Sequence, residues 1–269
     1  MPEVEVHGVT FHYEESGSGE PLLLLHGGGG TALLHFRREI AELGERYRVI
    51  APDMRGYGAS SPPRLFEGDF YGQDGLDTAA LLEALGAAPA HLCGWSDGSI
   101  AALIVAADRP ELVRTLCVWG AEGRILPQER ELWKNITNWQ EWPEPTQERF
   151  AQAQGPLNWP GILDRMVAGY SRVLEAGGMI VANRLDRVRC PTLILHGDED
   201  DVVPVEHAYE LHRLIYGSEL RIFHGAGHTL HRERHAELME LLASFIERQQ
   251  DAGTGAEEWE SVPGGWSGV

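Results

Sequence analysis

The chain has 269 residues, of which 43% are hydrophobic, enough to bury a large core in one α/β domain or two small ones. Its formal net charge of −19 argues against binding to nucleic acid or to an anionic membrane surface, because both need a basic face. The apolar runs are too short to span a bilayer, and the first residues lack a signal-peptide pattern. We therefore expect a cytoplasmic protein.

The first 120 residues alternate predicted strands and helices. Residues 3–7 and 9–14 alternate apolar and polar side chains around Gly8, which predicts an antiparallel hairpin. Strands follow at 21–26, 47–51, 90–94 and 113–119, with helices at about 31–43, 72–86 and 99–107 between them. Strand–helix alternation of this kind is typical of an α/β fold with a mostly parallel, doubly wound sheet.

This alternation stops between about 121 and 183, where the chain is rich in Trp, Glu, Gln and Pro. It resumes with a strand at 192–196, a helix at 204–216, a strand at 220–224 and a last helix at 233–248. We therefore expect a core formed by 1–120 and 184–249, with a helical lid over 121–183 above the strand ends. Residues 250–269 show little apolar periodicity and are predicted to be a flexible tail.

The motif Gly94-Trp-Ser-Asp-Gly98 stands between a predicted strand and a strongly apolar predicted helix. This is the context that a nucleophile elbow requires, because the turn must lift a serine hydroxyl clear of the sheet. Glycines at both ends permit such a sharp, strained turn. The alternative is that Ser96 only caps the helix. The flanking elements favour Ser96 as a catalytic nucleophile.

A nucleophilic serine needs a base, and the base needs an acid that orients it, in the chain order serine, acid, histidine. Asp200 follows the strand at 192–196, and His228 follows the strand at 220–224. Both residues fall in loops at the carboxyl ends of strands, where sites in such sheets form. We therefore expect His228 to be the general base and Asp200 the orienting acid.

Other residues compete for these two roles. Asp200 is favoured by the spacing Gly-x-x-Asp, followed by two apolar residues and Pro. For the base, one neighbouring histidine is predicted inside a strand and two lie on the predicted last helix. The competitors are Asp198 and Asp201 for the acid, and His224, His231 and His235 for the base.

The oxyanion of an acyl-transfer intermediate needs preorganised donors. We expect one to be the backbone N–H of Asp97, and the second to come from the run Gly27–Gly30, with Gly28 favoured over Gly29. The run lacks the Gly-Lys-Ser/Thr ending of a phosphate loop, so no nucleotide site is expected. Since no Cys/His cluster has metal-ligand spacing, we expect neither a metal nor a cofactor.

With these motifs in place, the chain resembles the α/β-hydrolase superfamily over nearly all of 1–249. Within it, the chain is similar to the valacyclovir hydrolase (biphenyl hydrolase-like) group of α-amino-acid ester hydrolases. The matching segments are Asp53-Met-Arg-Gly-Tyr-Gly, Gly94-Trp-Ser-Asp-Gly, Val118-Trp-Gly-Ala121, Leu193-Ile-Leu-His-Gly197 and Gly227-His-Thr-Leu-His231. The resemblance implies that Asp97, directly after the nucleophile, holds the α-ammonium group of the substrate.

The expected function is hydrolysis of carboxylic esters, α-amino-acid esters above all, with a small-molecule ester as the partner. Trp95 and tryptophans of the insertion are candidates to line the substrate pocket. A general carboxylesterase, or an amide or carbon–carbon bond hydrolase, would use the same three residues. A non-enzymatic receptor with this fold is disfavoured because all three positions are filled. The sequence leaves the oligomeric state open.

Overall fold

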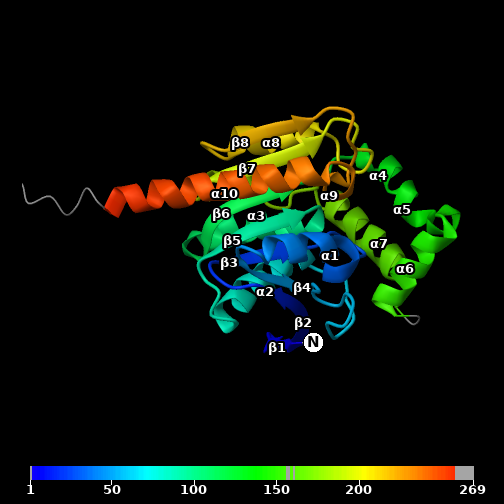
Figure 1. Ribbon diagram of the computed structural model, residues 1–269. Coiled ribbons are helices and arrows are strands. Elements are labelled where there is room, and N and C mark those ends of the chain that lie inside the picture. The colour runs from blue at the N-terminus through cyan, green and yellow to red at the C-terminus, as the bar shows by residue number, and fades with distance from the viewer. Residues whose placement is uncertain (1, 156–157, 160, 258–269) are drawn as a thin grey trace, which may run out of the picture.

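The computed structural model describes residues 2–155, 158–159 and 161–257 (Figure 1). Over these ranges the strands form one eight-stranded sheet in the order β1-β2-β4-β3-β5-β6-β7-β8. The pairs β1–β2 and β2–β4 are antiparallel, and all other neighbours are parallel. The strands are β1 (Glu3–Val6), β2 (Val9–Ser16), β3 (Pro21–Leu25), β4 (Arg48–Pro52), β5 (Ala90–Trp95), β6 (Val113–Trp119), β7 (Thr192–Gly197) and β8 (Glu219–Phe223). The prediction of a mostly parallel α/β sheet is confirmed.

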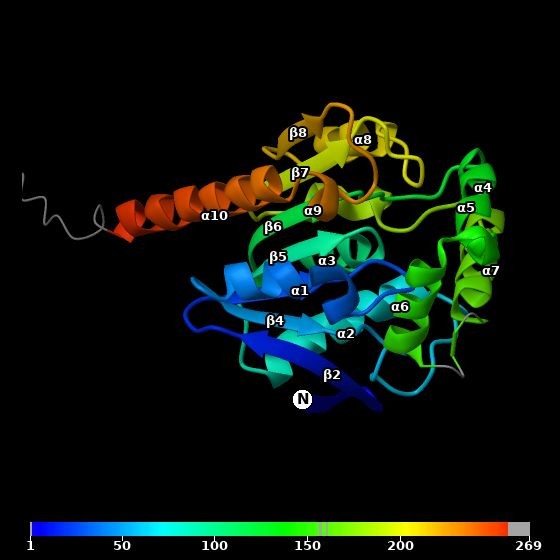
Figure 2. The same cartoon turned by 45° about the vertical axis from the view of Figure 1, so that its right-hand side comes forward.

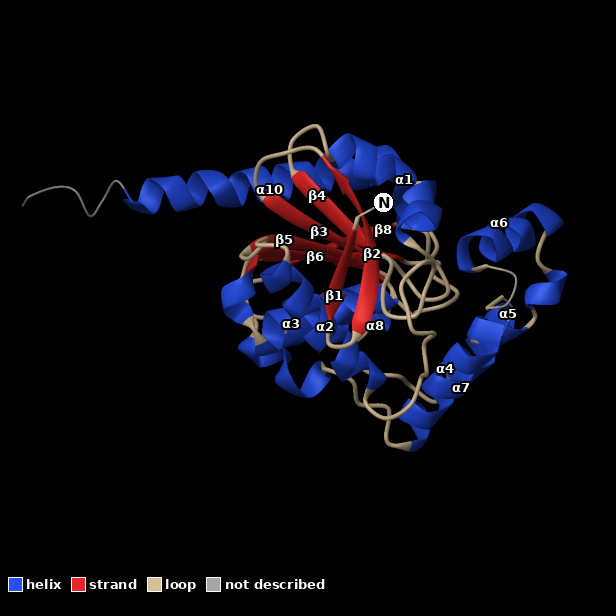
Figure 3. Cartoon of the chain, turned by 90° about the horizontal axis from the view of Figure 1, so that it is seen from below, coloured by secondary structure: helices blue, strands red, loops and turns tan. Residues whose placement is uncertain are grey.

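Helices cover both faces of the sheet, which is why its central strands are continuous apolar runs. Helices α1 (Ala32–Leu43) and α10 (His235–Glu257) lie on one face. Helices α2 (Phe70–Ala84), α3 (Asp97–Asp108) and α8 (Glu206–Leu214) lie on the other (Figure 3). None of the helices in the described ranges combines the length and the apolar character needed to cross a membrane.

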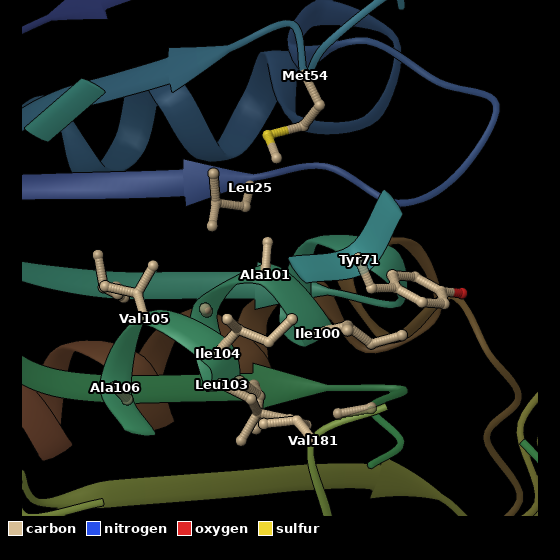
Figure 4. Packing of buried hydrophobic residues seen from close by; sticks show 14 of the residues in the cluster. Leu25, Met54, Tyr71, Ile100, Ala101, Leu103, Ile104, Val105, Ala106 and Val181 are labelled. Carbon is tan, nitrogen blue, oxygen red and sulfur yellow. The ribbon is translucent and has the colours of Figure 1, made fainter. Parts of the chain in front are cut away.

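The larger core cluster is built around α3, whose residues from Gly98 to Ala107 are all buried. Figure 4 shows side chains of this helix packed among Leu25, Met54 and Val181. Tyr71 stands at the edge of the cluster, and its hydroxyl points away from the core. The helix that follows Ser96 is therefore held rigidly by packing along its whole length.

The segment between β6 and β7 contains four helices among its described residues, and they stand beyond the carboxyl ends of the parallel strands (Figure 2). They are α4 (Glu129–Leu132), α5 (Lys134–Thr137), α6 (Glu144–Gln154) and α7 (Gly161–Glu175). Short 3₁₀ turns at Trp139–Glu141 and Ala182–Arg187 also belong to this segment, and a further turn at Pro110–Leu112 precedes β6.

The C-terminal region differs from the prediction in two respects. A short helix, α9 (Leu230–Glu233), precedes α10, so His231 lies on α9 and not on the last helix. Helix α10 continues to Glu257, whereas the sequence predicts its end at 248, because Gly and polar residues there weaken the apolar pattern. The predicted tail is therefore helical over 250–257, and its remainder, 258–269, lies outside the described residues.

Candidate active site

Ser96 forms the turn between β5 and α3, with φ of 54° and ψ of −125°. A non-glycine residue in this region of φ is strained, at a cost of roughly 1–3 kcal/mol. Close packing imposes the flanking glycines, because a Cβ atom on Gly98 would overlap the backbone of Leu25, and one on Gly94 would overlap that of Gly98. The strained elbow expected from the motif is therefore present in the backbone.

The hydroxyl of Ser96 is not used to cap α3. Ser96 occupies the N-cap position, but its side chain makes no capping hydrogen bond. Its backbone N–H donates to the carbonyl of Trp119 at 3.0 Å, which ties the elbow to the neighbouring strand β6. The side chain is half-buried and lines a cavity of about 320 Å³ that His228 also lines.

His228 and Asp200 form a hydrogen-bonded pair at this cavity. The Nδ1 atom of His228 donates to Oδ2 of Asp200 at 2.7 Å, so Nε2 is left as the acceptor nitrogen. Oδ1 of Asp200 accepts the backbone N–H groups of Val202 and Val203 at 2.9 and 2.8 Å. The hydroxyl of Ser96 makes no hydrogen bond to His228, and contacts of this kind between catalytic groups often tighten only when substrate binds.

The carboxylate of Asp200 is held ionised although it is almost completely buried. Burial alone raises its pKa, but the charge of His228 and hydrogen bonds from His196 and His228 bring it well below its ordinary value. His196, at the end of β7, lies 3.3 Å from Oδ2 of Asp200 and 2.9 Å from the carbonyl oxygen of Val203. Sequence reasoning missed His196, although it stands in the same His-Gly-Asp segment.

The competing residues are engaged elsewhere. Asp198 accepts a hydrogen bond from His224 at 2.7 Å, but the His224 side chain is 87% exposed and lies just beyond β8 instead of inside it. His235 pairs with Glu39 and Glu42 on α1. Asp201 is exposed at the cavity, and His231 is buried against the ring of Trp95.

The cavity lies between the strand ends and the inserted helices. Its apolar lining comes mainly from the inserted segment: Trp133, Ile136, Trp142, Phe150, Leu163, Met166 and Tyr170. Trp139 and Trp159 are packed against each other instead, with ring centroids 5.5 Å apart. Of the four tryptophans that the sequence offers in this segment, two therefore face the cavity.

Asp97 follows Ser96 and lines the same cavity. The Tyr170 hydroxyl donates to its oxygens at 3.0 and 2.8 Å, and the Tyr71 hydroxyl donates to Oδ1 at 3.2 Å. Burial raises the pKa of Asp97, against the opposing charge of Arg64. Gly28 lies directly beside this carboxylate, since an added Cβ would come within 2.7 Å of Oδ2. The sequence did not reveal the two tyrosines, because they come from α2 and α7.

Trp95 lines the cavity with a small part of its surface and is otherwise buried. Its indole Nε1 donates to the carbonyl oxygen of His228 at 2.9 Å. The residue before the nucleophile therefore holds the loop that carries the histidine.

Two carboxylates of the cavity wall and a buried histidine beside them form a group whose donor atoms suit a divalent cation. One oxygen each of Glu122 and Glu129 and one nitrogen of His207 lie within 4.8 Å of one another. Nε2 of His207 is already engaged by Oε1 of Glu129 at 2.5 Å. Sequence spacing could not reveal this group, because its members come from a loop and two separate helices.

Comparison with known proteins gives a consistent result. Residues 22–241 match the model of the alpha/beta hydrolase family. The chain is 33% identical to the serine hydrolase BPHL of Homo sapiens, over 91% of this chain and 86% of that protein. It is 30% identical to the 2-hydroxy-6-oxo-6-(2'-aminophenyl)hexa-2,4-dienoic acid hydrolase of Metapseudomonas resinovorans, over 92% and 91% of the two chains.

Solved structures show the same architecture. A meta-cleavage product hydrolase from Pseudomonas fluorescens superposes with a TM-score of 0.79 at 24% identity, covering 92% of this chain and 98% of that chain.

Proposed function

The chain belongs to the alpha/beta hydrolase family and is a serine hydrolase, and from that premise we propose that it cleaves esters of α-amino acids. In this proposal Ser96 is the nucleophile, His228 the general base and Asp200 the acid that orients the histidine. The observation that carries the substrate class is the carboxylate of Asp97, which faces the same cavity as Ser96.

Asp97 suits the recognition of an ammonium group next to the reacting carbonyl. Its carboxylate belongs to the residue after the nucleophile, so in this proposal it reaches a group on the carbon next to the carbonyl that Ser96 attacks. Hydrogen bonds from Tyr170 and Tyr71 fix the position of this carboxylate. A charge-assisted hydrogen bond to an ammonium there is worth about 1.5–3 kcal/mol, or one to two decades in kcat/KM.

The proposed reaction is acyl transfer to water. Nε2 of His228 takes the proton from Ser96 while the serine oxygen attacks the ester carbonyl, and collapse of the tetrahedral intermediate releases the alcohol with that proton. Water, deprotonated by the same histidine, then attacks the acyl-enzyme, and the free acid leaves as Ser96 recovers its proton. The backbone N–H groups of Asp97 and Gly28 are the proposed donors to the oxyanion.

The acidic lining of the cavity favours this function over cleavage of anionic dienoates, the substrate class in the name of the Metapseudomonas resinovorans relative. No lysine or arginine occurs among the described residues that line the cavity, whereas five carboxylates do. An anionic substrate would enter this field unfavourably, and a cationic one favourably.

The decisive experiment compares a valine ester with its N-acetylated form, which has no positive charge. We expect acetylation to lower kcat/KM by one to two decades in the wild type, and we expect Asp97→Asn to remove most of this difference. Equal rates for the two esters, or an equal loss on both in the variant, would identify a general carboxylesterase instead.

A further inference from the structure

Glu122 is a carboxylate at the cavity wall that the proposed mechanism does not use. It lies in the loop after β6, close to the carboxyl end of the sheet, and its side chain is 12% exposed. Its Oε2 atom is withdrawn from solvent and accepts no hydrogen bond from any described residue. A buried carboxylate oxygen without a donor is costly, so the arrangement favours a ligand that supplies one.

The other carboxylates at this cavity are compensated or exposed. Asp97 receives two tyrosine hydroxyls, and Glu129 receives His207 at 2.5 Å. Glu233 accepts the N–H of Gly227 and the hydroxyl of Thr229. Asp201 is open to solvent.

The nearby imidazole of His207 is not a hydrogen-bond partner of Glu122. Nε2 of His207 lies 3.8 Å from Oε2 of Glu122, beyond hydrogen-bond distance, and the same nitrogen is hydrogen-bonded to Glu129. Burial, the charge of Glu129 and a side-chain hydrogen bond shared with Glu129 hold the pKa of Glu122 well above its ordinary value. A positive charge arriving beside Glu122 would therefore stabilise its ionised form.

The position of Glu122 indicates which part of the substrate it faces. Glu122 lines the same cavity as Asp97 and Tyr170, and the hydroxyl of Tyr170 donates a hydrogen bond to Asp97. Trp133 and Tyr170 also line this cavity, and aromatic rings of this kind attract a cation.

We propose that Glu122 recognises a second positive charge, carried by the acyl side chain, so that the preferred substrates are esters of diamino acids such as lysine. This proposal rests on the proposed hydrolysis of amino-acid esters at Ser96. The α-ammonium is held by Asp97, and the side-chain ammonium donates to the free oxygen of Glu122.

Four methyl esters test the two carboxylates separately: those of lysine and norleucine, each with a free or an acetylated α-amine. Norleucine has the lysine side chain without its ammonium. We expect wild-type kcat/KM to be about 10- to 100-fold higher for the lysine ester than for the norleucine ester. Because the acetylated pair lacks the α-ammonium, its lysine/norleucine ratio reports on Glu122 even if the role of Asp97 fails.

The two matched variants are Glu122→Gln and Glu131→Gln, each of which replaces one glutamate with a neutral residue of the same size. Glu131 is exposed on α4 and paired with Lys134. We expect Glu122→Gln to bring the lysine/norleucine ratio close to one, and Glu131→Gln to keep the wild-type ratio. Thermal denaturation checks that both variants fold. The lysine/norleucine ratio of the wild type is measured without any variant, so it tests the proposal even if Glu122→Gln does not fold.

A wild-type ratio of one or less would overturn the proposal, as would an equal loss on both esters in Glu122→Gln. A rise in the wild-type Tm with Zn²⁺ that Glu122→Gln abolishes would also overturn it, because it would assign Glu122, Glu129 and His207 to a metal ion.

Discussion

At the residue scale, two Asp–His pairs in the C-terminal part of the chain have the same hydrogen-bond length of 2.7 Å. One joins Asp200 to His228 at the cavity, and the other joins Asp198 to His224 at the surface. Only the first pair is buried, with exposed fractions of 1% for Asp200 and 10% for His228. Burial, and not the contact itself, therefore distinguishes the proposed catalytic pair from its competitor.

Replacing the acid of each pair tests this assignment. We expect Asp200→Asn to lower kcat for a valine ester by roughly 10⁴-fold, because an amide no longer fixes the tautomer of His228 or stabilises its charged form. Asp198→Asn, the matched control, is expected to change kcat less than about twofold. A larger loss in the Asp198 variant would reverse the assignment.

The three catalytic candidates could be predicted from the sequence because each lies in or next to a short local motif. Ser96 stands in a turn whose glycines are imposed by packing, and Asp200 and His228 follow strands that apolar runs predict. Tyr170 and Glu122 were not accessible, since their importance depends on which helices close over the strand ends. Nothing local in the sequence specifies that arrangement.

We predict that the protein loses stability in mild acid, because His231 is buried beside the turn that carries Ser96. The pKa of His231 is lowered to about 3, by burial first and then by the nearby charge of Arg232. The unfolded chain takes up this proton near pH 6.5, so the free energy of unfolding falls as the pH decreases from about 6.5 towards 3. Between pH 6.5 and 5 this one residue contributes a loss of about 2 kcal/mol.

Urea denaturation of His231→Gln at these two pH values measures that contribution. Glutamine keeps a hydrogen-bond acceptor for the indole of Trp119, which His231 accepts at 3.4 Å. We expect the variant to lose about 2 kcal/mol less between pH 6.5 and 5 than the wild type does. An unchanged pH dependence in His231→Gln would contradict the prediction.

At the scale of elements, one side chain joins the inserted helix α6 to the glycine run. The amide nitrogen of Gln154 donates to the carbonyls of Gly29 and Gly30, each at 2.9 Å. Its amide oxygen accepts the N–H of Gly58 at 3.0 Å. The loop that holds the proposed oxyanion donor Gly28 is therefore positioned by the segment that covers the cavity.

Gln154→Glu replaces the NH2 group that makes both donations with a carboxylate oxygen, which then faces the two carbonyl oxygens. We expect the loop to shift and kcat/KM to fall by about 10- to 1000-fold, the range set by loss of one oxyanion donor. Gln152→Glu, on the exposed side of the same helix, is the matched control and should keep wild-type kcat/KM. If both variants lose activity equally, the added charge and not the loop would be responsible.

The elements themselves were predictable to different degrees. Strands β3, β5 and β6 are buried on both faces, so their apolar runs predict them well. Helices α4 and α5 have only four residues each, which is too short for a helical pattern of apolar residues to repeat. The sequence therefore predicts a helical segment there but not the individual helices. Their places are determined by tertiary packing against the strand ends.

At the scale of the whole molecule, the net charge of −19 and the acidic lining of the cavity both attract cations. A negative field focused at a cleft increases the local concentration of cations and their association rate. Salt screens this field, since the Debye length falls from about 30 Å at 0.01 M to about 3 Å at 1 M ionic strength.

The salt dependence of kcat/KM therefore differs between charged and neutral substrates. For a valine ester with a free ammonium, we expect kcat/KM to fall several-fold as NaCl increases from about 0.01 to 0.5 M. For the N-acetylated ester it should stay nearly constant, which controls for any effect of salt on the fold. Because steering acts on association, the loss should appear in kcat/KM while kcat at saturation changes little. An equal decline for both esters would mean that the charge of the molecule serves solubility alone and does not guide substrate to Ser96.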